Sequence, residues 1–405
     1  MKRFMKRIIC AVLVLALAAS ALTGCFPSAE NNTDSAGKGN SAGTGNSTNI
    51  GSLQGQTNPN DVSKYPLSIE DRDIPNLIIK VNVHMPDHYD LNRVLTTVSA
   101  EPKSWDRSQI VSAVANGRAV TEESSGENSG PDDKFYSYEL NDNSYFRFSN
   151  GCAGYYTEAA DEYEYDFYFD TFENNKDSLQ KFFGNTDIDG ISRGDAIDKA
   201  NELIALLGIG DIVGAPQVYA LSAENANYIR QEFQMEDKYG DAVPEWGAEQ
   251  EAYYIVYPMQ HQTLSAMGLT GSLETGGFYS TAFRVIYGRS GLLEFEADNI
   301  YDLKETVQEG FLYPPTDVVA GIKEYFSDVI LDSVLWFSNL SLTYVVTYEN
   351  DSLTKWKVEP VWFTQGKFQE DPTDEKAKKG TSGRMFTVMV SAVTGETIPV
   401  TSVAR

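Results

Sequence analysis

The sequence predicts an α+β fold, with two domains of antiparallel sheet and a few helices packed on one face, after a disordered linker. Short runs rich in Tyr and Phe alternate with Asn, Asp and Gly, as in a meander of antiparallel strands. Four other segments space apolar residues three and four apart, as amphipathic helices do. A folded part of about 340 residues exceeds the usual size of one hydrophobic core. We therefore expect an N-terminal domain at 66–190 and a C-terminal domain at 191–405.

The first 24 residues are expected to be a cleaved signal peptide. Four basic residues lie among the first seven positions, and an apolar run follows from Ile8 to Leu22. That run is shorter than the roughly 20 residues that span a bilayer comfortably. It leads into the sequence LTGC, which ends at Cys25 and resembles the lipobox of bacterial lipoproteins. The resemblance implies cleavage after Gly24, a diacylglycerol with palmitate-type chains on Cys25, and anchoring at the extracellular face of the cell membrane. The alternative is a plain secretory signal peptide.

Residues 25–65 are predicted to form a disordered tether. They consist mostly of Gly, Ser, Asn and Thr, with almost no large apolar side chains. Such a segment cannot bury enough apolar surface to offset the entropy that it would lose on ordering. Its root-mean-square reach is roughly 5–6 Å times the square root of its residue count. A tether of this kind suits a lipoprotein that must clear a thick cell wall, which favours a Gram-positive source.

The charge of the chain excludes several classes of partner. The signal peptide holds four of the 32 basic residues and no acidic residue, so the mature chain has 28 basic and 58 acidic residues and a net charge of −30. A body with this charge repels nucleic acid and anionic lipid headgroups. We expect no nucleic-acid partner, no cofactor, and membrane contact through the lipid anchor.

Cysteine usage excludes a disulfide scaffold. Cys10 is removed with the signal peptide and Cys25 is acylated, so Cys152 is left without a partner for an intramolecular disulfide. Cys152 is expected to be a small buried residue and not a nucleophile.

The predicted N-terminal domain opens with a half-buried strand over residues 77–85, where apolar and polar residues alternate. Residues 106–115 predict a short helix that begins at a capping aspartate, Asp106. Four short aromatic strands follow, at 134–140, 144–148, 154–158 and 163–169.

The predicted C-terminal domain opens with a helix that Ser192 caps and Gly208 ends. A strand at 216–221 and a helix at 223–233 come next. A later helix is predicted at 315–330, with its apolar residues on one face: Val318, Ile322, Tyr325, Phe326 and Val329. The remaining strands are expected at 251–259, 279–287, 291–297, 334–348, 356–363 and 385–393.

Three stretches of the C-terminal half resemble a known module. They are DAIDKANELIALLGI at 195–209, VEPVWFTQG at 358–366 and FTVMVSAVTGETIPV at 386–400. A helix leading to a strand, a Pro-x-Trp strand, and a strand that ends in Ala-x-Thr-Gly-Glu resemble PepSY-like and YycI-like modules of extracytoplasmic Gram-positive proteins. The resemblance covers residues 190–405. It implies a protein that binds or restrains another extracellular protein, and not an enzyme.

One candidate metal site lies in the sequence HMPDH, with His84, Asp87 and His88 as ligands. Two histidines four residues apart bind a metal when they share a helix face. Pro86 lies between them and a predicted strand precedes them, so a helix is disfavoured. A turn could still gather the three side chains around one ion. The alternative is the end of a strand followed by a Pro-Asp turn.

A second candidate metal site lies in NTDIDG. Asn185, Asp187 and Asp189 occupy positions one, three and five of a calcium loop, and Gly190 occupies position six. The twelfth position of such a loop needs Glu, and the residue there is Ala196. The alternative is a turn that leads into the following helix.

No catalytic constellation is predicted. Ser178 and Ser352 each precede a lysine by three residues, as in penicillin-interacting enzymes, but the further motifs of those enzymes are absent. Strand alternation would place Glu162, Glu164 and Asp166 on one face beside tyrosines on the other. Such a row could bind a sugar or a cation, or be a solvated face over a packed one.

These observations favour a non-enzymatic, membrane-anchored lipoprotein that acts by protein–protein contact, as a regulator of an envelope sensor or enzyme. The alternative is a lipoprotein that binds a sugar, a peptide or a metal ion in a cleft between the two halves. An exposed apolar patch would favour the first function. A deep cleft with convergent polar groups would favour the second.

Overall fold

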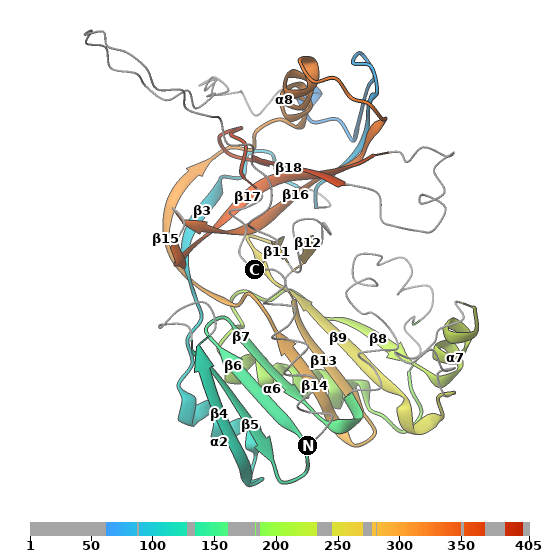
Figure 1. Cartoon of the computed structure of the whole chain (residues 1–405), viewed down its shortest axis with the longest axis vertical. Helices are drawn as coiled ribbons and strands as arrows, with labels where there is room; N and C mark the ends of the chain where they lie inside the picture. Colours follow the sequence, from blue (N-terminus) through green and yellow to red (C-terminus); the bar gives the residue numbers. More distant parts are fainter. Residues whose placement is uncertain are drawn as a thin grey trace, which may run out of the picture. The chain divides into compact units, whose positions relative to one another are not determined.

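The structure, a computed structural model, describes residues 62–86, 89–127, 134–160, 183, 187–232, 245–269, 278–280, 282–349, 352–368 and 385–399. These residues form two β-sheets, with eighteen strands and four α-helices (Figure 1). Within the described residues, no helix has the length and apolar character needed to cross a membrane.

The architecture is mostly β, so the predicted α+β class is wrong. The prediction relied on alternation of apolar and polar residues, and it missed strands that lack this pattern. β4 (Val120–Glu127) is exposed along nearly its whole length, and β15 (Tyr301–Gly310) is exposed over most of its length. Neighbouring strands and hydrogen bonds fix such segments, and their own side chains carry little hydrophobic pattern.

The first sheet has the strand order β1-β2-β16-β17-β3-β15. A long antiparallel hairpin, β16 (Leu335–Glu349) and β17 (Ser352–Phe368), forms its centre. β16 also runs parallel to β2 (Leu77–His84). This sheet is therefore mixed, whereas the sequence predicted an antiparallel sheet. The other strands of the sheet are β1 (Ser68–Asp71), β3 (Leu95–Pro102), β10 (Gln260–His261), β11 (Leu264–Leu269), β12 (Phe278–Ser280), β15 and β18 (Met385–Ser391).

The second sheet is antiparallel throughout and has the order β4-β5-β6-β7-β14-β13-β9-β8. Its aromatic residues stack on one another across strands, as Tyr138 does on Phe146 with ring centroids 4.7 Å apart. The predicted aromatic meander accounts for three of these strands. The strands beyond β4 are β5 (Lys134–Leu140), β6 (Tyr145–Ser149), β7 (Cys152–Tyr156), β8 (Gln217–Leu221), β9 (Ala252–Pro258), β13 (Ala282–Gly288) and β14 (Gly291–Ala297).

Each sheet combines strands from both sides of residue 190. β16 lies beside β2 in the first sheet, and β14 lies beside β7 in the second. Gly151 joins the segments where the chain passes between sheets: it donates to the carbonyl of Lys103 and accepts from the amide of Ile300, both at 2.8 Å. Its φ of +76° is a left-handed conformation that favours glycine, and a Cβ there would lie 3.1 Å from the Ile300 carbonyl oxygen.

The helices begin and end at the residues that their caps dictate. Asp106 caps α2 (Arg107–Ala115), and Ser192 caps α6 (Arg193–Leu207) by accepting from the amide of Asp195 at 3.1 Å. Gly208 ends α6 with a φ of +63°, as predicted. The other two helices are α7 (Ala223–Glu232) and α8 (Pro315–Ser327).

Candidate interaction surface

The first predicted metal site is only partly described. His84 is exposed at the end of β2, and its Nε2 lies 3.3 Å from Oδ1 of Asn339 on the neighbouring β16. Asp87 and His88 lie outside the described residues. The structure therefore places His84 beside an asparagine of the adjoining strand.

In the second predicted metal site, the structure gives Asp187 a cationic partner. Asp187 accepts a hydrogen bond of 2.7 Å from Nε of Arg193, and the guanidinium of Arg193 lies 5.3 Å from the ring centroid of Tyr253. Asp189 lies in a turn and is exposed, and Asn185 lies outside the described residues. In the described part of the chain, no group of three or more His, Cys, Asp or Glu side chains is placed to hold a metal ion.

Several other predicted sites also fall outside the described ranges: Gly24, Cys25, Ser178, Glu162, Glu164 and Asp166. Cys152 is described, at the start of β7. Burial raises the pKa of its thiol to about 12. At neutral pH it therefore lacks the thiolate that a nucleophilic cysteine needs.

α8 is fastened to the first sheet along one face. Five of its apolar side chains are buried, and Phe326 packs against Phe337 of β16 with ring centroids 6.4 Å apart. Lys64 forms an ion pair of 3.3 Å with Asp317 in the first turn of the helix. Lys323 forms two more, with Asp71 and Asp73. The buried apolar side chains are Pro315, Val318, Val319, Ile322 and Phe326.

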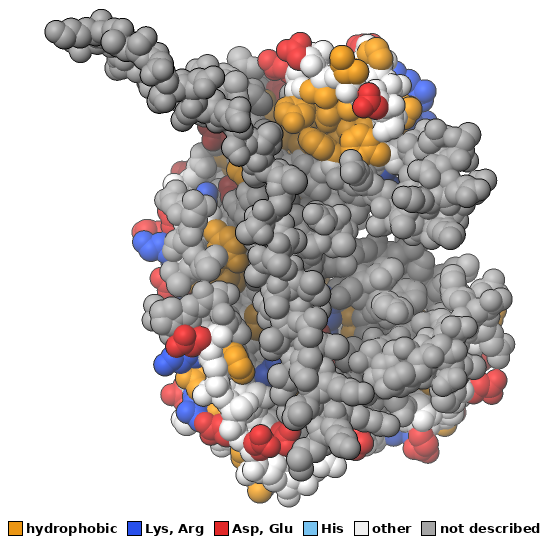
Figure 2. Space-filling view, in the orientation of Figure 1, with side chains coloured by type: hydrophobic (Ala, Val, Ile, Leu, Met, Phe, Trp, Pro, Cys, Tyr) orange, Lys and Arg blue, Asp and Glu red, His pale blue; other side chains and the backbone are white. Residues whose placement is uncertain are grey.

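The end of α8 exposes apolar side chains that were expected to be buried. The helix stops at Ser327, three residues before the predicted end. Tyr325 and Val329, which were predicted on the buried face, are 56% and 40% exposed, and Ile330 is 92% exposed. We call Tyr325, Val329 and Ile330 the α8 patch; Figure 2 shows hydrophobic side chains gathered over this helix. Contiguous exposed apolar surface is typical of interaction sites.

Aromatic contacts hold Tyr325 of the α8 patch in place. The Tyr325 ring meets the Phe326 ring edge-on at 5.0 Å between centroids, and it lies 5.9 Å from the ring of Phe386 on β18. Phe386 in turn meets Phe326 at 5.2 Å. Tyr325 is therefore positioned by a packed aromatic base although more than half of its surface faces solvent.

Acidic residues adjoin the α8 patch in sequence. Glu324, Asp328 and Asp332 are exposed, and none of them forms an ion pair with another described residue. The last turn of α8 holds no basic residue, and Asp328 is its C-cap. The C-terminus of a helix carries a partial negative charge, and a nearby carboxylate is unfavourable there by about 0.3–1 kcal/mol.

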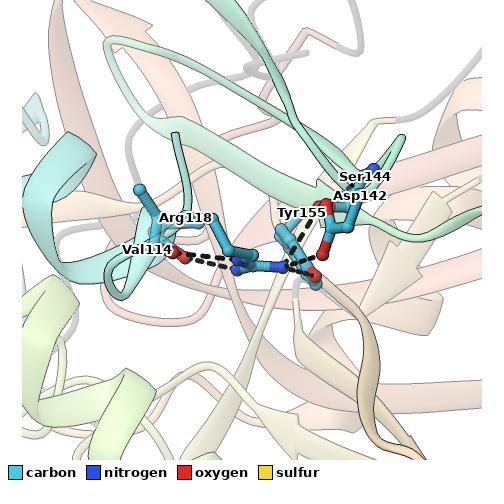
Figure 3. Close-up of polar contacts among 6 residues, drawn as sticks. Val114, Arg118, Asp142, Ser144 and Tyr155 are labelled. Carbon is cyan, nitrogen blue, oxygen red and sulfur yellow. Dashed lines mark hydrogen bonds and ion pairs between the residues drawn. The ribbon is translucent and has the colours of Figure 1, made fainter. Parts of the chain in front are cut away.

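α2 ends in the opposite way. Arg118 donates from Nε to the carbonyl of Ala115 at 2.9 Å and from Nη2 to that of Val114 at 2.6 Å (Figure 3). Its Nη1 also bonds to Asp142, Ser144 and the hydroxyl of Tyr155, at 2.9, 3.1 and 2.6 Å. A guanidinium thus caps this helix end and joins it to β7 and to the turn before β6.

A second polar network lies on the second sheet. Arg147 of β6 and Glu296 of β14 both lie opposite Gly154 of β7. The ring of Tyr156 lies over Gly154, where a Cβ would come within 2.7 Å of its hydroxyl. That hydroxyl accepts from Arg147 at 3.3 Å and donates to Glu296. Burial raises the pKa of Glu296, and the hydrogen bond from Tyr156 works against this rise.

Sequence reasoning missed both arginine networks and the exposure of the α8 patch. The partners of Arg118 come from three separate segments, so no local motif contains them. A signal for the α8 patch did exist, because Asp328, Val329 and Ile330 follow a helix with no basic residue in its last turn.

No family model matches the chain, and no curated protein matches it. Among solved structures, the fold is similar to the crystal structure of an uncharacterized protein from Eubacterium rectale ATCC 33656. The TM-score is 0.52 at 14% sequence identity, and the alignment covers 82% of this chain and 94% of the other. At this identity the likeness concerns the fold alone.

Proposed function

We propose that the protein is a non-enzymatic lipoprotein, anchored to the outer face of the cell membrane through Cys25, that acts by binding a partner protein through the α8 patch. The LTGC sequence at Cys25 supports the anchor. The observation that carries the binding function is the α8 patch, above all the 92% exposure of Ile330. The resemblance to PepSY-like and YycI-like modules points to the same class of function, restraint of an envelope protein.

The energetics favour a protein as the partner. Burying an isoleucine side chain contributes about 1.5–3 kcal/mol, and Ile330 leaves nearly all of this contribution unused. Tyr325 is held by contacts with Phe326 and Phe386, and tyrosine is among the residues that contribute most to protein–protein affinity. The net charge of −30 in the mature chain disfavours nucleic acid and anionic lipid as alternatives.

The proposal is tested by crosslinking in intact cells, followed by affinity capture and mass spectrometry. Wild type is compared with Cys25→Ala, Ile330→Ser and the control Tyr228→Ser; Tyr228 is 54% exposed on α7. We expect one membrane or envelope protein to be captured by wild type and by Tyr228→Ser, and to be lost with Ile330→Ser and Cys25→Ala. Equal capture by wild type and Ile330→Ser would overturn docking at the α8 patch.

A ligand-binding function is the second candidate, and buried hydroxyl groups near β10 favour it. Among the described residues, the hydroxyls of Tyr89 and Tyr301 are buried without a hydrogen-bond partner. Burial also raises the pKa of Tyr344, which bonds to Gln262 at 2.8 Å, to about 12. Gln262 and Thr263 hold consecutive left-handed conformations, with φ of +48° and +67°, and such strain clusters at functional sites.

This second candidate predicts stabilisation by a small polar ligand. A soluble glycan or peptide that raises the melting temperature of wild type, and raises it less in Tyr344→Phe, would support it. An equal rise in both proteins would place the ligand elsewhere.

A further inference from the structure

We propose, on the basis of the docking function above, that the partner presents lysine or arginine side chains to the C-terminal end of α8 while its apolar side chains cover the α8 patch. The proposal names the chemistry of the partner surface: an apolar centre with a basic rim. It rests on the charges around the α8 patch, on the direction of the helix, and on how the same chain completes another helix.

Charge complementarity carries the first step. Glu324, Asp328 and Asp332 are exposed and lie within two residues, along the chain, of one of the three exposed apolar residues, and no described basic residue pairs with these carboxylates. Lys323, the basic residue nearest in sequence, points to Asp71 and Asp73 instead. A partner that brought acidic or purely apolar groups to this rim would leave the carboxylates repelled or desolvated, which is costly. A cation beside each carboxylate removes that cost.

The direction of α8 adds to the negative electrostatic potential of these carboxylates. Its C-terminal turn presents the negative end of the helix dipole next to the carboxylates, because Asp328 is the C-cap. Carbonyls of the last turn accept hydrogen bonds from the hydroxyl of Ser327 and the amides of Asp328 and Val329, and in the described part of the chain no lysine or arginine bonds to them. The helix end can therefore still accept hydrogen bonds from a cationic side chain.

α2 shows how the chain completes such an end with its own residues. Arg118 caps two carbonyls of α2 and bonds to three further groups. α8 has the same requirement, no cation among the described residues meets it, and the side chains of Tyr325, Val329 and Ile330 are exposed near that point. We infer that the partner supplies from outside what Arg118 supplies to α2 from within.

Two other occupants fit less well. A second copy of this chain in a two-fold arrangement would bring the same patch to itself, and so would place acidic rim against acidic rim. A membrane surface rich in anionic lipid would face both the rim and the net charge of −30. A basic-rimmed protein surface satisfies both the apolar centre and the rim.

The test uses two matched peptides with the purified full-length lipoprotein in detergent. The peptides share an amphipathic helix of leucine and alanine and carry either lysine or glutamate at the flanking positions. Binding is measured by fluorescence anisotropy for wild type, Asp328→Lys and Asp211→Lys, which change the net charge equally; Asp211 is exposed and lies outside the helices. A change of charge sign at the cap is favourable to α8 itself, so a loss of binding is not a loss of fold.

We expect the lysine peptide to bind wild type, and Asp328→Lys to weaken it about three- to tenfold, as for loss of a charge pair beside a helix end. Asp211→Lys should weaken it less than about twofold, because only screened long-range attraction changes. Equal weakening by both variants, or equal binding of the two peptides, would overturn the basic rim.

Capture of the partner from cells, repeated with these variants, tests the basic rim separately from the docking function. If capture is lost with Ile330→Ser and also with Asp328→Lys, while Asp211→Lys keeps it, the inference holds. If Ile330→Ser abolishes capture and Asp328→Lys leaves it intact, the docking function stands and the basic rim is overturned. If Ile330→Ser leaves capture intact, both are overturned.

Discussion

The C-terminal ends of α2 and α8 differ in whether a cation of the chain neutralises the partial negative charge of the helix end. At α2, Arg118 bonds to two helix carbonyls and links them to Asp142, Ser144 and Tyr155, which closes the end inside the protein. At α8, Asp328 occupies the cap with no basic residue in the last turn, and Ile330 stands almost fully exposed beside it. The first arrangement serves stability. The second gives up stability at a point where apolar surface is also exposed, and this combination is typical of a binding surface.

The largest expected effect comes from removal of the internal cap. Arg118→Ala removes five hydrogen bonds and leaves partly buried carbonyls and the buried Tyr155 hydroxyl without their donor. We expect the free energy of unfolding to fall by about 2–4 kcal/mol. Chemical denaturation measures it, with Arg72→Ala as the control. Among the described residues, Arg72 forms a side-chain ion pair with Glu70 alone, and that pair is exposed. A loss in the control equal to that in Arg118→Ala would contradict the role of Arg118 as a cap.

The pH dependence of stability sharpens the account of this cap. Desolvation works to raise the pKa of Asp142, but hydrogen bonds from Ser144 and Arg118 outweigh it and hold the pKa at about 2. A lowered folded-state pKa means that ionised Asp142 stabilises the fold fully above about pH 4, and that this contribution is lost as the pH falls through about 2. Since its side chain is 45% exposed, solvent screening limits the contribution to about 1 kcal/mol.

Unfolding curves between pH 6 and pH 2 test this, with wild type and Asp142→Asn side by side. The variant should lose less stability than wild type on acidification, because it has no carboxylate to protonate. Parallel curves would show that Asp142 is not one of the groups that drive acid unfolding.

Completion of the α8 end with a cation should stabilise the protein. Asp328→Lys replaces an unfavourable charge at the C-cap with a favourable one, and we expect a gain of about 0.3–1 kcal/mol in the free energy of unfolding. Asp211→Lys makes the same change in net charge away from the helix, and the comparison of the two by thermal or chemical denaturation isolates the local effect. An equal gain in both variants would mean that only the overall negative charge is being relieved.

The smallest expected effect on stability is at the α8 patch. Ile330→Ser changes a side chain that is 92% exposed, so the free energy of unfolding should stay within about 0.5 kcal/mol of wild type. A loss beyond this range, measured by chemical denaturation, would show that Ile330 packs against the protein and is not held free for a partner.

Local chemistry predicted the caps of α2 and α6, because a cap and the residues it serves are neighbours in sequence. Asp106, Ser192 and Gly208 were identified in this way. The mostly β character was missed because β4 and β15 are polar strands held by their neighbours. The burial of Tyr325 and Val329 was mispredicted because helical spacing gives an apolar stripe without telling how much of it the sheet covers.

The kind of function stays a prediction: the LTGC sequence predicts an anchor, and the resemblance of residues 190–405 predicts action by protein contact. The sequence did not locate the candidate surface, because that surface depends on where α8 stops and on what Lys323 pairs with. Arg118 could not be found from sequence, since its partners lie 3, 24 and 37 residues away.

Site-specific photo-crosslinking in intact cells tests the central claim most directly. A photoreactive residue is placed at position 330 in the α8 patch or, as the matched control, at position 228 on α7, both exposed. The account predicts a crosslink from position 330 to one envelope protein, at a segment that combines apolar residues with lysine or arginine, and none to that protein from position 228. The same products from both positions, or none from position 330, would contradict it.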